Sequence, residues 1–304
     1  MTTDPLTTEL SGIAGVAVRV REPLSRHTSF KVGGPADYFV EAHTSRGLSA
    51  CLRALEGRGV PVLLLGNGSN LLVSDQGVRG AVLRLRGEFR KVRWHDSGAE
   101  VGAAYAVSRL VREAVRRGRG GLEFAEGIPG SVGGSLVMNA GAYGSEMERV
   151  VNRVDAMTAA GEALALGREE LRFSYRETRL PRDAVVTRVG MVLTPETAEV
   201  VDARMRAIMA RRRESQPSGH PNFGSVFRNP PGDHAGRLIE ASGLKGLRVG
   251  SAEVSRRHAN FIVNRGGARA QDVRRLIEQV CSEVESRFSV RLQTEVRFAG
   301  EWPQ

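Results

Sequence analysis

The sequence predicts a mixed α and β protein of two or three domains, built around a glycine-lined stretch. Its 304 residues are enough for a substantial core in more than one domain. Apolar residues recur with helical spacing in some segments and form short strand-like runs in others. The stretch Glu126–Gly144 has six glycines among nineteen residues, with apolar residues between them. Glycine is favoured where backbone adopts a positive φ or lies against a bulky group. A solvated loop is usually shorter and more polar, so the stretch predicts a buried cradle for an extended cofactor.

The N-terminal part predicts a strand–helix–strand unit. Residues Pro23–Glu41 place the turn Gly33-Gly34-Pro35 between two β-like runs. Thr44–Gly57 has its leucines and Cys51 on one face, which predicts an amphipathic helix with Cys51 in the core. A continuously apolar strand, Val60–Leu65, then runs into a turn of small residues.

That turn, Gly66–Leu71, matches neither familiar phosphate-binding motif. The G-x-G-x-x-G pattern requires glycine where Leu71 stands, and no Gly-Lys-Ser/Thr follows as in a Walker A loop. A chain of small residues can still present free backbone N–H groups to an anion. The turn therefore indicates a phosphate-binding role only in combination with other signals.

The central part predicts alternating strands and helices. Expected strands, from short apolar and β-branched runs, are Ala81–Arg86, Arg90–Trp94, Glu100–Ala103, Val150–Ala156, Ala163–Leu166 and Ala184–Leu193. A hairpin turn is expected at Ala160-Gly161, and apolar spacing predicts a helix at Tyr105–Arg117. Thr194-Pro195 has the residue types of an N-cap and a first helical position, which predicts a helix from there to about Arg213.

The C-terminal part begins at the breaker-rich segment Gln216–Asn222, which predicts a domain boundary. Expected strands beyond it are Phe223–Arg228, Ala259–Val263 and Leu292–Phe298. A helix capped by Asp233 should end at Gly243. Ala270–Phe288 has the clearest helical pattern in the chain.

Composition narrows the function classes. The net charge of +10 comes almost entirely from arginines spread along the chain, and aromatic residues make up only 5%. Such a pattern indicates a solvated basic surface that attracts an anionic small molecule, rather than a nucleic-acid site with stacking platforms. Two cysteines cannot form a disulfide framework, and no apolar run reaches membrane-spanning length. We therefore expect a cytoplasmic protein without nucleic acid or membrane insertion.

Several reaction chemistries lack their motifs. Six histidines are scattered without HExxH or CxxC partners, which argues against a metal site, and no serine stands in a G-x-S-x-G elbow. From the residues alone, the interpretation ends at an α/β protein that binds a phosphorylated, extended ligand.

Eight ordered segments carry a resemblance to a known family. They are PLSRHTSFKVGGPADYF (23–39), GNGSNLLVSD (66–75), GLEFAEGIPGSVGGSLVMNAGAYG (121–144), FSYRETRL (173–180), PNFGSVFRNP (221–230), AGRLIEASGLKG (235–246), HANFIVN (258–264) and LQTEVRF (292–298). Together they resemble the UDP-N-acetylenolpyruvoylglucosamine reductases, also called UDP-N-acetylmuramate dehydrogenases, of bacterial peptidoglycan synthesis. The length resembles that of the shorter, type II members.

The resemblance implies an α+β fold. It implies a two-lobed FAD-binding domain of the vanillyl-alcohol-oxidase (PCMH) type and a C-terminal α+β substrate-binding domain. The expected divisions are residues 1–85 for the first FAD-binding subdomain, completed by strand 296–304, then 86–214 for the second and 215–295 for the substrate domain. It also implies a monomer that uses FAD, with NADPH as hydride donor and UDP-N-acetylglucosamine enolpyruvate as the other substrate.

Cofactor-binding residues are implied in both glycine-rich segments. The first group, expected to hold the pyrophosphate by backbone N–H groups, is Gly66, Asn67, Gly68, Ser69, Asn70 and Leu71. The second group, expected beside the flavin and adenosine, is Gly127, Ile128, Gly130, Ser131, Gly133, Gly134, Asn139, Ala140, Gly141 and Tyr143.

Three catalytic residues follow from the resemblance and suit the implied chemistry. Hydride addition to the enol ether leaves negative charge beside the carboxylate, so the site needs a cation, an acidic partner and a proton donor. Arg176 matches the cation, since its guanidinium can bind a carboxylate bidentately. Ser225 matches the proton donor and Glu295 the acidic partner. Tyr175, Arg176 and Asn229 match substrate-binding positions.

Some positions depart from the family pattern, and other functions remain open. Thr178 and Thr294 stand where serine and proline are usual, and Ala104 and Ser251 replace glycines. A different oxidase or dehydrogenase on the same flavin domain is one alternative. A non-catalytic nucleotide-sugar-binding protein is another, and a nucleic-acid-binding protein is a third.

Overall fold

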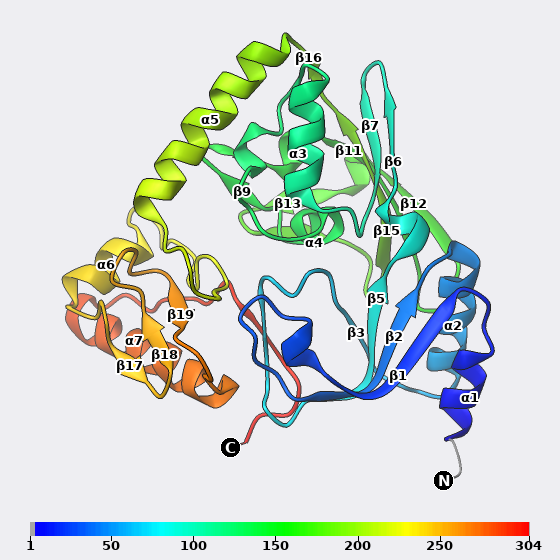
Figure 1. Cartoon of the computed structure of the whole chain (residues 1–304), viewed down its shortest axis with the longest axis horizontal. Coiled ribbons are helices and arrows are strands. Elements are labelled where there is room, and N and C mark those ends of the chain that lie inside the picture. Colours follow the sequence, from blue (N-terminus) through cyan, green and yellow to red (C-terminus); the bar gives the residue numbers. More distant parts are fainter. Residues whose placement is uncertain (1–3, 304) are drawn as a thin grey trace. The chain divides into compact units, whose positions relative to one another are not determined.

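The computed structural model describes residues 4–303, and the chain divides into two units (Figure 1). Unit 1 comprises Met1–Arg21, Asp37–Asn67 and Gly80–Ala210. Unit 2 comprises Glu22–Ala36, Gly68–Arg79 and Arg211–Gln304. Two short N-terminal segments therefore belong with the C-terminal part, because their buried residues Phe30, Val32 and Leu72 pack in its core.

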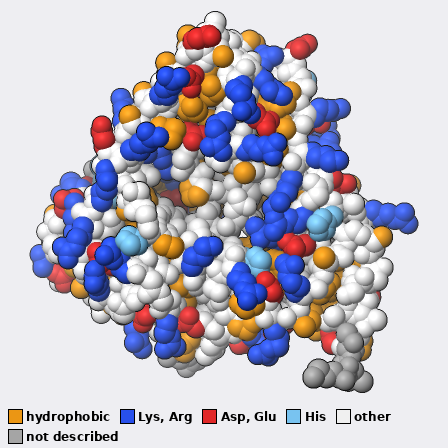
Figure 2. Space-filling model, viewed as in Figure 1, with side chains coloured by type: hydrophobic (Ala, Val, Ile, Leu, Met, Phe, Trp, Pro, Cys, Tyr) orange, Lys and Arg blue, Asp and Glu red, His pale blue; other side chains and the backbone are white. Residues whose placement is uncertain are grey.

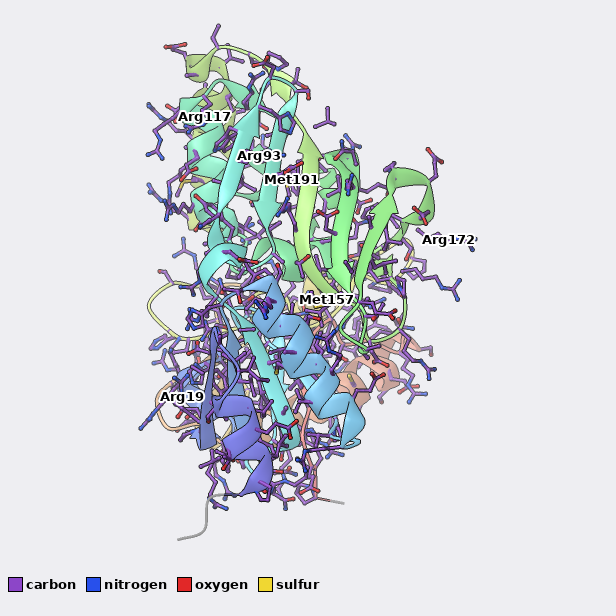
Figure 3. The ribbon with its side chains drawn as sticks, turned by 90° about the vertical axis from the view of Figure 1, so that its right-hand side faces the viewer. Arg19, Arg93, Arg117, Met157, Arg172 and Met191 are labelled. Carbon is purple, nitrogen blue, oxygen red and sulfur yellow. The ribbon has the colours of Figure 1, made fainter. Side chains whose placement is uncertain are left out.

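The first sheet of unit 1 has four strands in the order β1-β2-β5-β3. They are β1 (Val16–Pro23), β2 (Pro35–Ala42), β5 (Val78–Leu85) and β3 (Val62–Leu64). Helices α1 (Pro5–Ser11) and α2 (Ser45–Gly57) pack on one face of it (Figures 1 and 3). The predicted helix at residues 44–57 is confirmed, with Thr44 as its N-cap. The strand predicted at 60–65 is shorter and lies at the sheet edge, so Val62 and Leu64 stay over a third exposed.

The second sheet of unit 1 has five strands in the order β12-β11-β15-β7-β6. They are β12 (Ala163–Gly167), β11 (Val151–Met157), β15 (Val185–Val192), β7 (Gly98–Gly102) and β6 (Val92–His95), and each neighbouring pair is antiparallel. Figure 3 shows Arg93 on the edge strand and Met191 and Met157 within the sheet. These strands and the turn at Gly161 (φ +74) confirm the predicted elements of this region.

Two helices of unit 1 pack on one face of this sheet. They are α3 (Val107–Arg116) and α4 (Val132–Val137). The inward side chains of α3, including Leu110 and Val111, join the same core cluster as the sheet, which confirms the predicted helix at 105–117. The remaining strands of the unit form two-stranded pairs: β8 (Arg119–Gly120) with β16 (Thr194–Pro195), β9 (Gly141–Ala142) with β10 (Ser145–Glu146), and β13 (Arg172–Ser174) with β14 (Glu177–Arg179).

Unit 2 combines a small antiparallel sheet with two helices. The sheet has the order β17-β18-β19, formed by β17 (Arg248–Val249), β18 (Ala252–Val254) and β19 (Ile262–Asn264). Helices α6 (Ala235–Ala241) and α7 (Ala270–Phe288) contribute Leu238 and Leu276 to its core. The parallel pair of β4 (Leu71–Val73) with β20 (Arg297–Ala299) brings the chain's C-terminal strand to the segment after the glycine turn. The predicted helix at 270–288 is confirmed to the residue.

Tertiary contacts also place the N-terminus of α7. The Asp75 carboxylate accepts hydrogen bonds from the backbone N–H groups of Ala270 (2.9 Å) and Gln271 (3.1 Å). These groups have no partner within a helix, so a side chain distant in sequence caps α7. The ring of Phe30 stacks on Phe223 with centroids 4.2 Å apart, which holds the first segment of unit 2 on the C-terminal part.

The predicted helix start at Thr194-Pro195 is wrong. These two residues pair with Gly120 and Arg119 as strand β16, and helix α5 (Ala198–Ser215) begins three residues later. Thr and Pro suit a helix start by local chemistry, but pairing with a distant strand takes precedence here.

Two predicted strands and one cap of unit 2 are also wrong. Residues 223–228 form no regular strand, because Gly224 has φ +81 and only Phe227 makes an isolated bridge, with Thr294. The strand predicted at 292–298 is confined to β20 (Arg297–Ala299). The N-cap of α6 is His234; the Asp233 side chain instead pairs with Arg237.

The surface and the cysteines agree with the composition. Figure 2 shows Lys and Arg side chains spread over the visible face with Asp and Glu among them. Burial raises the pKa of the Cys51 thiol to about 12, so it is a neutral core residue at physiological pH, as predicted. None of the helices within residues 4–303 combines the length and apolar character needed to cross a bilayer.

Candidate active site

The middle of the glycine stretch forms the short helix α4, which contacts the second sheet. Ser131 caps α4 and accepts a hydrogen bond from the Gly134 N–H (3.3 Å). The N–H groups of Val132 and Gly133 donate to the carbonyls of Tyr105 and Ala103. A Cβ at residue 133 would lie 2.9 Å from the Ala103 Cβ. Glycine is therefore required where α4 meets the end of β7.

The turn at Gly66 approaches this helix closely. A Cβ at residue 66 would lie 2.7 Å from the Ser131 hydroxyl oxygen. None of the hydrogen bonds found among residues 4–303 uses the backbone N–H of Gly66 or Asn67. Small residues, open N–H groups and a hydroxyl thus lie close together in unit 1. Such donors suit a phosphate-bearing cofactor, and the residues present fit FAD in this respect.

Gly68, the next glycine of the turn, belongs to unit 2. Its φ is +63, and a Cβ there would lie 2.3 Å from the His27 carbonyl oxygen. The Ser29 N–H donates to the Gly68 carbonyl (3.0 Å). The sequence signal of small residues at 66–71 therefore reflects two close backbone approaches, one in each unit.

Asn139, predicted as a cofactor-binding residue, is fully buried. Its Nδ2 donates to the Ser174 carbonyl (3.1 Å), and its Oδ1 accepts from the Glu148 N–H (3.0 Å). Both polar atoms of the side chain are thus engaged within the protein. This geometry makes Asn139 a link between the glycine stretch and the hairpin β13–β14.

The end of the glycine stretch is a β-hairpin. Tyr143 (φ +54) and Gly144 (φ +78) form its two-residue turn between β9 and β10. Two positive φ angles are the signature of a type I′ turn. The Tyr143 side chain is 42% exposed, so its ring is available to a flat ligand.

Arg176 stands at the tip of hairpin β13–β14. Its φ of +61 is unusual for a residue other than glycine, and such strain is often found at functional sites. One guanidinium nitrogen donates to the Gly141 carbonyl (3.0 Å), and the group lies 4.9 Å from the centroid of the Tyr175 ring. The guanidinium has five N–H donors, so it can hold Gly141 and still bind a carboxylate.

A second hydrogen bond ties this hairpin to the glycine stretch. The buried Thr178 hydroxyl donates to the Leu136 carbonyl at the end of α4. Thr178 departs from the serine usual in the family but keeps the hydroxyl group. The position needs a hydroxyl, which both residues supply.

We expect Thr178→Val to lower the free energy of unfolding by about 1–1.5 kcal/mol, because the Leu136 carbonyl would lose the hydroxyl donor and keep only its hydrogen bond from the Asn139 N–H. Thr178→Ser, which keeps the hydroxyl, should stay within about 1 kcal/mol of the parent protein. Urea unfolding of both variants measures the difference. Equal losses in the two variants would show that the methyl group, not the hydrogen bond, matters.

Ser225 and Glu295 lie on neighbouring backbone segments of unit 2. The Glu295 N–H donates to the Val226 carbonyl (2.8 Å), and Phe227 bridges to Thr294. No hydrogen bond of the Ser225 hydroxyl is found within residues 4–303. A Cβ at the preceding Gly224 would meet no atom within 4 Å. Ser225 itself is partly exposed.

Two asparagines position this pair of segments. The Asn260 side chain accepts from the Phe227 N–H and donates to the Phe227 carbonyl, both at 2.9 Å. Asn70 Nδ2 donates to the Glu295 carbonyl (3.0 Å). Asn70 was predicted only as a cofactor-binding residue. Asn260 lies in the motif 258–264, but no role was predicted for it. Asn229 Oδ1 accepts from the Ala235 N–H (3.1 Å) at the start of α6.

The predicted site residues therefore form two groups. Unit 1 brings together Gly66, Ser131, Asn139, Gly141 and Arg176 through the contacts above. Unit 2 brings together Asn70, Ser225 and Glu295. Within the described chain, residues 4–303, no group of three or more His, Cys, Asp or Glu side chains could hold a metal ion.

Two family models match separate regions of the chain. The family model described as FAD binding domain matches residues 36–167, and the model described as UDP-N-acetylenolpyruvoylglucosamine reductase, C-terminal domain, matches residues 216–299. The predicted α+β fold with an FAD-binding domain and a C-terminal domain is thereby confirmed.

Relatives that match this chain over most of their own length are named UDP-N-acetylenolpyruvoylglucosamine reductases. The UDP-N-acetylenolpyruvoylglucosamine reductase 2 of Symbiobacterium thermophilum is 51% identical over 94% of this chain and 93% of its own. The reductase of Heliobacterium modesticaldum is 48% identical, with 92% and 90% covered. The crystal structure of the Thermus caldophilus UDP-N-acetylenolpyruvylglucosamine reductase has a TM-score of 0.83 at 40% identity, covering 93% of this chain and 99% of that one.

Proposed function

We propose a role for each of the predicted catalytic residues in the reaction of this family. The chain belongs to the family of UDP-N-acetylenolpyruvoylglucosamine reductases. It is an FAD oxidoreductase that reduces UDP-N-acetylglucosamine enolpyruvate to UDP-N-acetylmuramate in peptidoglycan precursor synthesis. NADPH is the hydride donor that membership in this family implies.

The proposed roles follow from where charge develops. FAD held by the glycine-rich segments of unit 1 would supply the hydride that adds to the terminal methylene carbon of the enol ether. Arg176 holds the substrate carboxylate, beside which the negative charge forms, and the protonated carboxyl group of Glu295 donates a hydrogen bond to an enolate-like oxygen. Ser225 delivers the proton from its hydroxyl to the carbon next to the carboxylate, so hydride and proton together saturate the double bond.

Of the proposed roles, that of Ser225 has the strongest support from the structure's hydrogen bonds. Its hydroxyl makes no hydrogen bond found among residues 4–303, while the Glu295 backbone bonds to the neighbouring Val226. A serine that is merely structural usually bonds to nearby backbone. Tyr175 and Asn229 are proposed substrate contacts, at the hairpin tip and at the start of α6.

The test of the whole proposal separates the two half-reactions. The flavoprotein should be bleached by NADPH without oxygen, and the flavin colour should return when UDP-N-acetylglucosamine enolpyruvate is added. The proposal would be refuted if the protein did not bind flavin, or if this substrate did not reoxidise the reduced flavin.

We expect Arg176→Lys to slow reoxidation of the reduced flavin by substrate about a hundredfold. An ammonium group cannot reproduce the bidentate contact with the carboxylate, and a lost charge-assisted hydrogen bond costs about 1.5–3 kcal/mol. Reduction by NADPH should be unchanged. Stopped-flow absorbance measures both steps, and Arg179→Lys in the same hairpin is the matched control. Normal reoxidation in Arg176→Lys would contradict the bidentate role.

Organisation and location complete the proposal. The three-part division at residues 85, 214 and 295 stays a prediction. The pairing of β20 with β4 supports the expected joining of the C-terminal strand to the first part, and the family region that begins at residue 216 supports the boundary at 214. We further propose a cytoplasmic monomer that does not bind nucleic acid, since the arginines are dispersed.

A further inference from the structure

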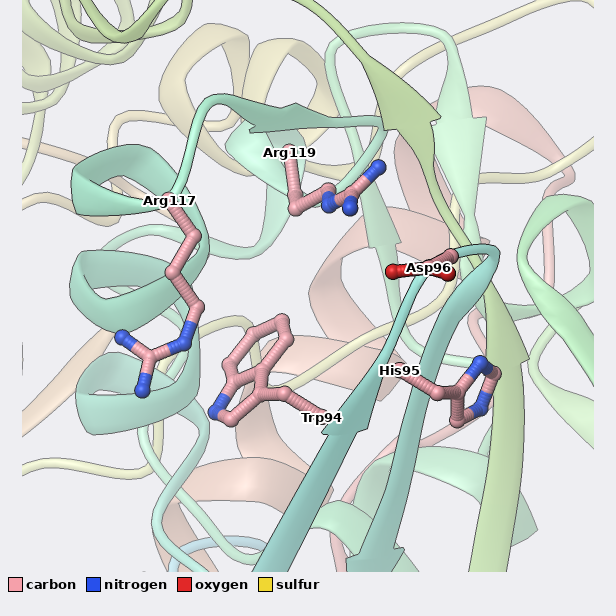
Figure 4. A pocket seen from close by; sticks show the side chains of 5 residues that line it. All are labelled: Trp94, His95, Asp96, Arg117 and Arg119. Atoms are coloured by element: carbon pink, nitrogen blue, oxygen red, sulfur yellow. The ribbon is translucent and has the colours of Figure 1, made fainter.

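A hollow in unit 1 lies apart from the glycine stretch. It has a volume of about 300 Å³ and is lined by Trp94, His95, Asp96, Arg117 and Arg119 (Figure 4). These residues come from β6, from the turn that follows it, from the C-terminal end of α3 and from β8. The opposite end of α3 contacts the glycine stretch, where the Val107 N–H donates to the Gly130 carbonyl (3.2 Å). A ten-residue helix is about 15 Å long, so the two places are separate.

The hollow has two guanidinium groups, Arg117 and Arg119, and one carboxylate, Asp96. Neither Arg117 nor Arg119 forms an ion pair with a carboxylate in the described part of the chain, residues 4–303. Many other arginines of the protein do pair with a carboxylate, for example Arg109 with Glu113 and Arg204 with Glu123. Two arginines beside one cavity favour an anion, and guanidinium groups match phosphate geometry.

The Trp94 ring forms a fixed wall of the hollow. Its Nε1 donates to the Glu113 carboxylate (3.4 Å), which also accepts from Tyr105 (2.6 Å). The Arg117 guanidinium lies 4.9 Å from the centroid of the ring. Figure 4 shows Arg117 on one side of the indole and Arg119 and Asp96 on the other. An indole held in this way can stack a flat ring.

We propose that this hollow is a second ligand site, and that it binds a nucleoside monophosphate or a closely similar ring-bearing phosphate. The phosphate binds Arg119, and the base lies against the side of Trp94 away from Arg117. The Asp96 carboxylate accepts hydrogen bonds from sugar hydroxyl or base amino groups. A volume of about 300 Å³ lies at the lower end of the range for small-molecule sites.

Titration calorimetry of the FAD-loaded protein with adenosine 5′-monophosphate tests the proposal. We expect one saturable site, weakened about tenfold or more by Arg119→Gln through loss of a charge-assisted contact. Arg116→Gln, which changes an exposed arginine of α3 that does not line the hollow, should bind like the parent protein. Flavin content, measured in each variant, should stay unchanged, because the hollow is separate from the glycine stretch.

Two further measurements identify the ligand class. Trp94 is the sole tryptophan in Trp302→Phe, so its fluorescence should change along the same binding curve. Inorganic phosphate should bind more weakly than the nucleotide. The proposal is overturned if the nucleotide shows no saturation in the millimolar range or binds Arg119→Gln normally. Equal affinity for phosphate alone would refute the nucleoside part and thus the proposed class.

Discussion

Ser225→Ala is expected to slow reoxidation of the reduced flavin by UDP-N-acetylglucosamine enolpyruvate about a thousandfold. General acid catalysis contributes about a hundredfold to ten-thousandfold, and the variant has no hydroxyl from which the carbanion could take a proton. Reduction of the flavin by NADPH should keep its normal rate, because no proton is delivered to the enolpyruvyl carbon in that step. Anaerobic stopped-flow absorbance follows each half-reaction separately.

The matched control is Ser251→Ala. Ser251 also lies in unit 2, and the hydrogen bond found for it uses its backbone carbonyl, which accepts from the Arg265 N–H. Removal of the Ser251 hydroxyl should leave the rates of both half-reactions unchanged. If Ser225→Ala slowed the two half-reactions equally, the serine would be a structural residue and not the proton donor. A normal rate of reoxidation would point to another donor.

Gly68→Ala is expected to yield a destabilised protein that retains little FAD. The new Cβ would lie 2.3 Å from the His27 carbonyl oxygen and 2.8 Å from the Thr28 Cα, so the backbone must shift. The positive φ of +63 adds about 1–2 kcal/mol for a residue with a Cβ, and overpacking adds about 1–3 kcal/mol. The ratio of flavin to protein absorbance and the thermal midpoint measure the two effects.

Gly59→Ala separates backbone strain from the clash. Gly59 has almost the same φ, +64, but a Cβ there would meet no atom within 4 Å. This variant should lose only the strain energy and should keep its flavin. If Gly68→Ala behaved like Gly59→Ala, the close approach at His27 would not matter, and the turn would not need glycine for packing.

Local patterns predicted the long elements well. The apolar spacing of Ala270–Phe288 and of Thr44–Gly57 indicated α7 and α2 with nearly the observed ends, since helical amphipathicity is a property of neighbouring residues. Predictions failed where a distant partner took precedence. Thr194 and Pro195 pair with β8 instead of starting a helix, and the Asn260 side chain takes the place of a strand partner for Phe227.

The candidate site shows the same limits. Glycine composition indicated the stretch Glu126–Gly144, but not that Asn139 within it faces the protein interior and holds Ser174. The resemblance of motifs supplied Arg176, Ser225 and Glu295. It did not indicate the positive φ of Arg176, because that conformation depends on the hairpin turn and its bonds to Gly141 and Leu136.

The family, the FAD chemistry and the main helices could be predicted from the chain alone, because they depend on residue types in a fixed order and on local periodicity. The side chains that support the catalytic segments could be identified only from the folded protein. Asn70 and Glu295 are 225 positions apart, and Asp75 caps a helix that starts 195 positions later. Such hydrogen bonds form only when folding brings distant segments together, so no local sequence pattern predicts them.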